Sequence, residues 1–117
     1  MKLAIPKEVR EGESRVALVP ESVKKLAAAG FEVSVEKGAG TASHYPDEAY
    51  AQVGAKVIPY VEDLLGTADL VAKVGVPAQG AGTHEAQMFR PSSMLLTSLM
   101  PLRNLGVVKD LAARQIT

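Results

Sequence analysis

The chain has 117 residues, of which 47% are hydrophobic and 22% are charged, a balance that indicates a globular domain, or part of one, with a substantial apolar core. Thirteen basic residues offset thirteen acidic ones, and three tyrosines and two phenylalanines are the only aromatic residues, so neither the basic surface nor the stacking surface of a nucleic-acid-binding protein is expected. Because the chain contains no cysteine, disulfides, thiol nucleophiles and thiolate metal sites are excluded.

Strand-like and helix-like patterns alternate along the chain, which predicts a parallel sheet covered by helices. In chain order, strands are predicted at Lys2 to Ile5, Glu32 to Glu36, Lys56 to Ile58, Leu70 to Val74 and Met94 to Ser98. Helices are predicted at Glu21 to Ala29, Asp47 to Val53, Val61 to Leu65 and Arg103 to Arg114, while His84 to Phe89 fits either a short helix or a loop. The expected fold class is therefore α/β, a three-layer α/β/α parallel sheet of the flavodoxin-like type.

Two local signals support the helix boundaries. Gly30 follows the first helix at the place where a left-handed residue is wanted. Pro46, followed by the acidic Asp47 and Glu48, starts the second helix.

The last two residues, Ile116 and Thr117, follow the final helix as the first residues of another strand would. We therefore expect a sheet that is incomplete at its C-terminal end. No linker or repeat divides residues 1–117, so the chain is interpreted as the N-terminal portion of one domain in a longer protein.

Two Gly-Ala-Gly triplets raise the question of a nucleotide site. Glycine turns at a helix N-terminus bind phosphate through free backbone N–H groups, and the dinucleotide fingerprint needs a further glycine three residues on. Ser43 stands there after the triplet Gly38 to Gly40, and Glu85 stands there after Gly80 to Gly82. Both triplets are therefore interpreted as turn glycines, and no cofactor-binding residue is predicted.

Arg15 and Lys73 are the candidate substrate-binding residues. Arg15 ends the charged loop after the first strand, and Lys73 interrupts the nearly continuous apolar segment Ala68 to Val76. The ordinary alternatives are a solvated arginine and an edge lysine that reaches solvent. Because parallel strands share one carboxyl edge, we predict that both side chains face a common cleft flanked by Ser98 to Pro101, with Glu8 as the acidic neighbour that relieves their repulsion.

The other titratable residues carry no predicted chemistry. His44 and His84 are far apart and lack the spacing of metal ligands, so no metal site is predicted. Glu8, Glu11 and Glu13 form a charged loop cluster, for which the simplest interpretation is solvation. No catalytic residue is predicted.

Two sequence blocks resemble one enzyme family. The opening MKLAIPKEVREGESRVALVP resembles the I-P-K-E, charged loop and R-V-A-L-[TV]-P that begin chains of the alanine dehydrogenase and proton-translocating NAD(P) transhydrogenase α-subunit family. GFEVSVEKGAG (Gly30 to Gly40) and YPDEAYAQVGA (Tyr45 to Ala55) resemble its next signature. The resemblance implies a second, doubly wound domain that carries the NAD fingerprint and is absent here. It also implies that Arg15 and Lys73 match the residues that hold the carboxylate and carbonyl of pyruvate in alanine dehydrogenases.

Met100 distinguishes the two branches of this family. Aligning the T-x-L core, Thr97 to Leu99, places Met100 where alanine dehydrogenases have a histidine for acid-base chemistry, and methionine cannot transfer a proton. Transhydrogenase α-subunits also lack this histidine, because hydride passes directly between two nicotinamide rings. Pro101 to Asn104 also resembles the transhydrogenase pattern, so this branch is favoured.

By this resemblance, the chain is the N-terminal part of an oxidoreductase subunit that transfers hydride between NADH and NADP⁺, coupled to proton translocation. NAD would be held mainly by the absent domain and NADP by a partner subunit, so the chain alone is expected to be inactive. The implied partners are the rest of its own chain, a second copy in a homodimer, and the membrane and NADP-binding subunits. The expected location is cytoplasmic and peripheral to the inner membrane, since the longest apolar-rich segment, Met94 to Leu102, is too short to cross a bilayer.

Two alternatives remain open. One is the N-terminal domain of alanine dehydrogenase or of a related amino-acid dehydrogenase. The other is a non-catalytic assembly module.

Overall fold

Five parallel strands form a single sheet in a computed structural model that describes residues 1–117. The strands are β1 (Lys2–Ile5), β2 (Glu32–Glu36), β3 (Lys56–Ile58), β4 (Leu70–Ala72) and β5 (Met94–Leu96), and they lie in the order β3-β2-β1-β4-β5. The predicted α/β fold class is confirmed. This order is that of Rossmann-type sheets, which share their layers with the flavodoxin-like sheets, and it reverses between β1 and β4, where open parallel sheets bind ligands.

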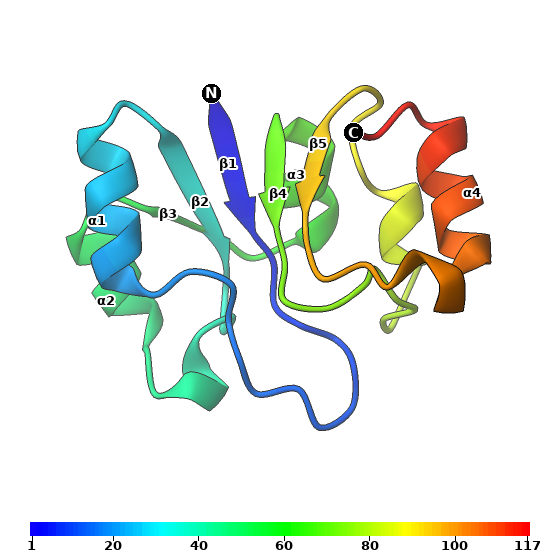
Figure 1. The fold of residues 1–117 in the computed structure, drawn as a ribbon. Helices are drawn as coiled ribbons and strands as arrows, with labels where there is room; N and C mark the ends of the chain where they lie inside the picture. The colour runs from blue at the N-terminus through cyan, green and yellow to red at the C-terminus, as the bar shows by residue number, and fades with distance from the viewer.

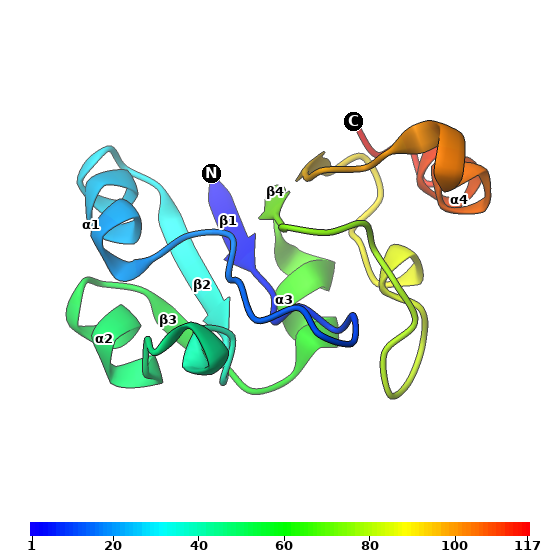
Figure 2. The same cartoon turned by 60° about the horizontal axis from the view of Figure 1, so that its bottom comes forward.

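The helices lie on both faces of this sheet and make three layers (Figures 1 and 2). Helices α1 (Pro20–Ala28) and α2 (Asp47–Gln52) cover one face. Helices α3 (Val61–Thr67) and α4 (Leu105–Ala113) lie on the other side. Three single-turn 3₁₀ helices complete the fold: η1 (Thr41–Ser43), η2 (Glu85–Gln87) and η3 (Pro101–Arg103).

The central strand β1 supplies the core on both faces, because successive side chains of a strand point to opposite sides. Leu3 and Ile5 pack into the cluster under α1 and α2, whereas Ala4 packs with Val71 into the cluster on the α3 side. Tyr50 of α2 is fully buried, and its hydroxyl donates a hydrogen bond to the carbonyl oxygen of Leu18 at 2.9 Å. Burial raises the pKa of this phenol to about 12. The bond ties the loop before α1 to α2.

The first three strands have the predicted bounds, but β4 and β5 each end two residues earlier than predicted. The reason lies outside the strands. The backbone N–H groups of Val74 and Gly75 donate to the carboxylate of Glu8, and the hydroxyl of Thr97 donates to the carbonyl oxygen of Gly75. Beyond the regular ladder, backbone bonds from Lys73 N–H to the Leu96 carbonyl oxygen and from Ser98 N–H to the Val74 carbonyl oxygen still join the two segments.

The predicted helix Arg103 to Arg114 begins two residues later, as α4, and is preceded by the turn η3. Asn104 produces this break, since its side-chain amide donates to the carbonyl oxygens of Leu99 and Met100. Met100 itself is left-handed, with φ +47°. The segment His84 to Phe89, which fitted a helix or a loop, contains only the short turn η2.

Gly30 has φ +98° and ends α1 as predicted, and α2 starts at Asp47 as predicted. At the other end of the chain, Thr117 donates to the carbonyl oxygen of Ser93 and accepts from Leu95 N–H, the two bonds of a parallel ladder beside β5. None of the helices combines the length and the apolar character that a membrane-spanning helix requires.

Candidate functional site

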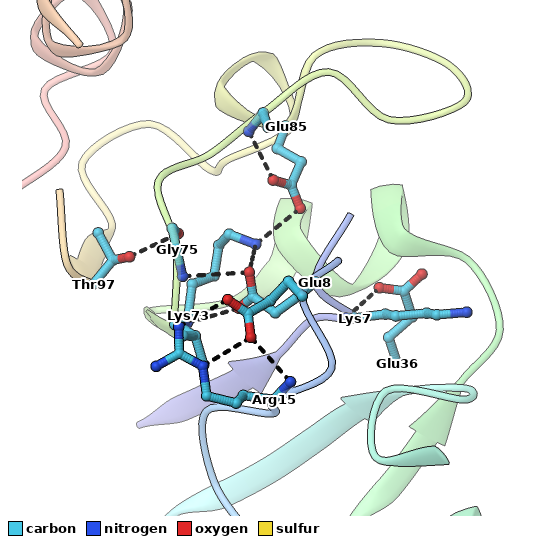
Figure 3. A network of polar contacts seen from close by, with 11 residues as sticks. Lys7, Glu8, Arg15, Glu36, Lys73, Gly75, Glu85 and Thr97 are labelled. Atoms are coloured by element: carbon cyan, nitrogen blue, oxygen red, sulfur yellow. Dashed lines mark hydrogen bonds and ion pairs between the residues drawn. The ribbon is translucent and has the colours of Figure 1, made fainter. Parts of the chain in front are cut away.

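The carboxyl ends of β1 and β4 lie side by side at the point where the strand order reverses. The loop after β1 carries Glu8 and Arg15, and Lys73 directly follows β4. The segment that connects β4 to η2 then brings Glu85 to the same edge (Figure 3). This edge is the candidate site, as the topology predicted.

Lys73 is a buried cation held by two carboxylates. Its Nζ lies 3.1 Å from Glu8 Oε2 and 3.2 Å from Glu85 Oε1, and the three side chains are only 1%, 2% and 2% exposed. A buried ammonium needs such pairing to offset its loss of hydration. The prediction that Glu8 is the acidic neighbour is confirmed for Lys73, whereas the alternative of an edge lysine reaching solvent is wrong.

Glu8 itself is buried, so its interpretation as a solvated loop residue was wrong. Its carboxylate accepts from Val74 N–H at 2.6 Å and from Gly75 N–H at 3.4 Å, in addition to pairing with Lys73. These donors replace the water that a carboxylate would lose on burial. The loop after β1 is thereby fastened to the end of β4.

Glu85 is the functional-site residue that the sequence reasoning missed. Its second oxygen, Oε2, accepts from Ala78 N–H at 2.9 Å, while Glu85 N–H donates to the Ala78 carbonyl oxygen at 3.1 Å. The loop between these two residues is therefore closed at its base. No local sequence signal marked Glu85, because its burial beside Ala86 and Phe89 is a property of the folded chain.

Arg15 lies at the same edge but in solvent. Its side chain is 71% exposed and grips Glu13 with two hydrogen bonds, Nε to Oε1 and Nη2 to Oε2, each 2.8 Å long. These bonds to Arg15 lower the pKa of Glu13 to about 2. Glu13, with a smaller contribution from Glu8, raises the pKa of Arg15.

Arg15 and Lys73 thus share an edge of the sheet, as predicted, but they do not share an open cleft. Neither residue lines any of the four cavities in the structure. Two carboxylates enclose Lys73, whereas Arg15 extends into solvent beside Glu13, so the two cations do not face a common cavity. Of the flanking residues, Ser98 donates its N–H to the carbonyl oxygen of Val74 at 3.4 Å.

A cavity of about 220 Å³ does lie at this edge, beneath the glycine loop, and Val9, Glu36, Glu85 and Met88 contribute to its lining. Burial raises the pKa of Glu36, and the nearby Glu85 carboxylate adds to this effect. The Glu36 carboxylate accepts from Lys7 N–H at 2.7 Å. No group of three or more carboxylate, imidazole or thiol side chains in the structure is arranged to hold a metal ion.

The first glycine triplet serves a tight turn. Gly38 has φ +80°, and its N–H donates to Asp47 Oδ1 at 2.8 Å. A Cβ atom on Gly40 would lie 2.7 Å from the Tyr45 carbonyl oxygen and 2.8 Å from the Tyr50 ring. Both features agree with turn glycines that are needed for packing.

Met100 lies at the start of η3, just beyond β5, with 58% of its surface exposed. Its thioether carries no proton to give or take. The residues next to it, Leu99 and Pro101, are apolar as well. Arg103 is the ionisable side chain of this turn.

The chain matches one known family over nearly its whole length. The family described as "Alanine dehydrogenase/PNT, N-terminal domain" matches residues 4–117. The chain is 44% identical over 118 residues to an NAD(P) transhydrogenase subunit alpha of Rhodospirillum rubrum, covering all of this chain and 31% of that protein. It is 32% identical over 117 residues to the alanine dehydrogenase of Methanococcus maripaludis, covering all of this chain and 30% of that protein.

Among solved structures, the crystal structure of transhydrogenase from Sinorhizobium meliloti superposes with a TM-score of 0.90 at 36% identity, covering all of this chain and 33% of that one. The chain therefore spans about a third of the length of these relatives. The relatives that this chain resembles therefore include proteins named as dehydrogenases and proteins named as transhydrogenases.

Proposed function

Since the chain belongs to the family of alanine dehydrogenase/PNT N-terminal domains, we propose that it is the N-terminal part of the α-subunit of a proton-translocating NAD(P) transhydrogenase. The full protein then takes part in hydride transfer between NADH and NADP⁺. The higher identity to a transhydrogenase subunit than to an alanine dehydrogenase over the same whole chain supports this branch.

The presence of methionine at position 100 is the single observation on which the choice of the transhydrogenase branch rests. Oxidative deamination of an amino acid transfers hydride from Cα to NAD⁺ and moves protons at the amino nitrogen and the attacking water, so it needs a group that takes and returns those protons, and such groups contribute about a hundred- to ten-thousand-fold to the rate. The thioether of an exposed methionine cannot do this. Direct transfer of hydride between two nicotinamide rings needs no such group.

The pairing of Lys73 supports the same choice. A substrate carbonyl or carboxylate could reach its ammonium only by displacing Glu8 or Glu85, and the displaced buried carboxylate would then lack its partner. We therefore assign Lys73 a structural role and revise its proposed contact with substrate. Arg15, which is exposed, is the member of the pair that can bind an anion, by exchanging Glu13 for it.

The proposal places NAD mainly on a domain beyond this chain and NADP on a partner subunit. It includes a homodimer, membrane and NADP-binding partner subunits, and a cytoplasmic position peripheral to the inner membrane. The chain alone then performs no hydride transfer. The use of Gly38 and Gly40 in a packed turn supports the absence of a dinucleotide site here.

Calorimetric titration of residues 1–117 with NADH tests the cofactor assignment. The expected result is weak binding or none, because neither glycine triplet offers free N–H groups at the start of a long helix. Micromolar binding by this chain would place a cofactor site within it.

The choice of branch is tested by assaying the full-length protein for alanine-dependent formation of NADH. We expect no useful rate, with the alanine dehydrogenase of Methanococcus maripaludis as the positive control under the same conditions. Robust alanine oxidation would instead identify the protein as the second candidate, an alanine dehydrogenase, which the identity to that relative keeps open.

Arg15→Ala in the full-length protein separates the candidates further. In a transhydrogenase, NADH affinity should stay nearly unchanged. In an alanine dehydrogenase, the variant should lose several kcal/mol of transition-state binding through the missing contact to the substrate carboxylate. A non-catalytic assembly module would show neither hydride transfer nor NADH binding before or after the substitution.

A further inference from the structure

Two loops at the carboxyl edge of the sheet meet at one buried ammonium. Glu8 comes from the loop after β1, which also carries Arg15, and Glu85 closes the loop that begins at Ala78 and contains the second glycine triplet. Both carboxylates contact Lys73 Nζ, at 3.1 and 3.2 Å (Figure 3). Ionised carboxylates only accept hydrogen bonds, so the contact between the two loops at this point runs through Lys73.

This arrangement makes the two contacts depend on each other. Lys73 Nζ is buried, so losing one carboxylate leaves the ammonium with half of its compensation in a low-dielectric environment. The remaining pair then changes in strength and position, because members of a buried polar network are not independent. Formation of one ion pair with Lys73 therefore favours formation of the other.

Each carboxylate is also fastened to backbone that belongs to its surroundings. Glu8 accepts from the N–H groups of Val74 and Gly75, and Glu85 accepts from Ala78 N–H. A change in either carboxylate is therefore transmitted to backbone hydrogen bonds. The exchange rates of these backbone N–H groups therefore report on the coupling directly.

We propose that Lys73 couples the Arg15-bearing loop after β1 to the glycine loop Gln79 to His84, so that ordering of one loop orders the other. This inference goes beyond the proposed function and does not depend on which reaction the full protein performs. Its consequence is that an anion bound at Arg15 changes the order of a loop on the far side of Lys73, through energetic coupling between two sites. The coupling element is the Glu8–Lys73–Glu85 triad.

Amide hydrogen exchange on the full-length protein tests the proposal with the variants Glu8→Gln and Glu85→Gln. Glutamine keeps one oxygen, which can still accept the bond from Val74 N–H in Glu8→Gln or from Ala78 N–H in Glu85→Gln, and it replaces the charged oxygen that faces Lys73 with an amide group. Glu8→Gln should accelerate exchange at Ala78 and Glu85, to which Glu8 makes no hydrogen bond. Glu85→Gln should accelerate exchange at Val74 and Gly75, and each cross effect should be about tenfold or more, as expected when a buried charged group loses a partner.

Two controls make the result decisive. Glu32→Gln alters a carboxylate of the neighbouring strand β2 that pairs with Lys56 in solvent, and it should leave exchange at Ala78 and Glu85 unchanged. In a Lys73→Met background the cross effects should disappear. If that variant does not fold, the two single variants still decide the question.

Cross effects from both single variants, absent in Glu32→Gln, support the coupling. Effects confined to the loop that carries the substitution would overturn it. Equal acceleration throughout α1 and α2 would also overturn it, because the triad would then act only through global stability. None of these outcomes depends on hydride transfer or on NADH binding.

Discussion

The two cationic residues at the carboxyl edge of the sheet differ mainly in what surrounds their charge, protein groups or water. Lys73 is a cation without solvent, compensated by Glu8 and Glu85, whereas Arg15 keeps most of its hydration and holds Glu13. Chemical type alone made the two cations equivalent candidates for substrate binding. Burial separates their roles, because only an exposed cation can exchange its partner for an incoming anion.

Replacing Lys73 should therefore be costly. Lys73→Met removes the only cation that contacts two buried carboxylates, and it should lower the free energy of unfolding by about 3–5 kcal/mol in urea denaturation. Lys56→Met is the matched control, since Lys56 pairs with Glu32 in solvent and should cost no more than about 1 kcal/mol. Equal effects for the two variants would show that the triad does not behave as a buried ion pair.

Arg15 should control the titration of Glu13. The pKa of Glu13 lies at about 2 because Arg15 stabilises the charged carboxylate, so Arg15→Ala should return it toward 4.5, followed by NMR. A lowered pKa stabilises the fold above pH 4.5, and this stabilisation is lost as the pH falls through about 2. The variant should lack that part of the acid dependence. An unchanged Glu13 titration in Arg15→Ala would mean that the ion pair does not form in solution.

At the level of elements, the turn after β2 depends on a close approach of backbone and ring. Gly40→Ala should destabilise the fold by about 1–3 kcal/mol, because its Cβ would lie within 3 Å of the Tyr45 backbone and the Tyr50 ring. Gly82→Ala is the matched control: its Cβ would meet nothing within 4 Å, so it should be neutral or slightly stabilising. Thermal unfolding of the two variants checks this, and a harmless Gly40→Ala would show that the turn relaxes easily.

The elements also show how far local sequence can predict this structure. Strands β1, β2 and β3 follow from apolar segments bounded by turn residues, and their bounds needed no distant information. The end of β4 could not be predicted, because Glu8, more than sixty residues earlier in the chain, accepts from the N–H groups of Val74 and Gly75. Likewise, the edge shared by Arg15 and Lys73 follows from parallel topology, but the burial of Lys73 depends on Glu85, a tertiary contact that no local pattern encodes.

For the whole molecule, the parallel sheet brings the loops after β1 and β4 to one edge, where the Glu8–Lys73–Glu85 triad joins them. The chain spans about a third of the length of its relatives, and these include transhydrogenases and alanine dehydrogenases on the same architecture. Fold alone therefore does not choose between them. The choice depends on chemistry at this edge, where Met100 offers no proton and Lys73 is already paired.

The most direct test of this account is hydride transfer by the full-length protein combined with its NADP-binding partner subunit. Reduction of an NAD⁺ analogue by NADPH is followed spectroscopically, and the same preparation is then given alanine and NAD⁺. The account predicts transfer between the two nucleotides and no NADH formation from alanine. Rapid NADH formation from alanine, with no transfer between nucleotides, would contradict it.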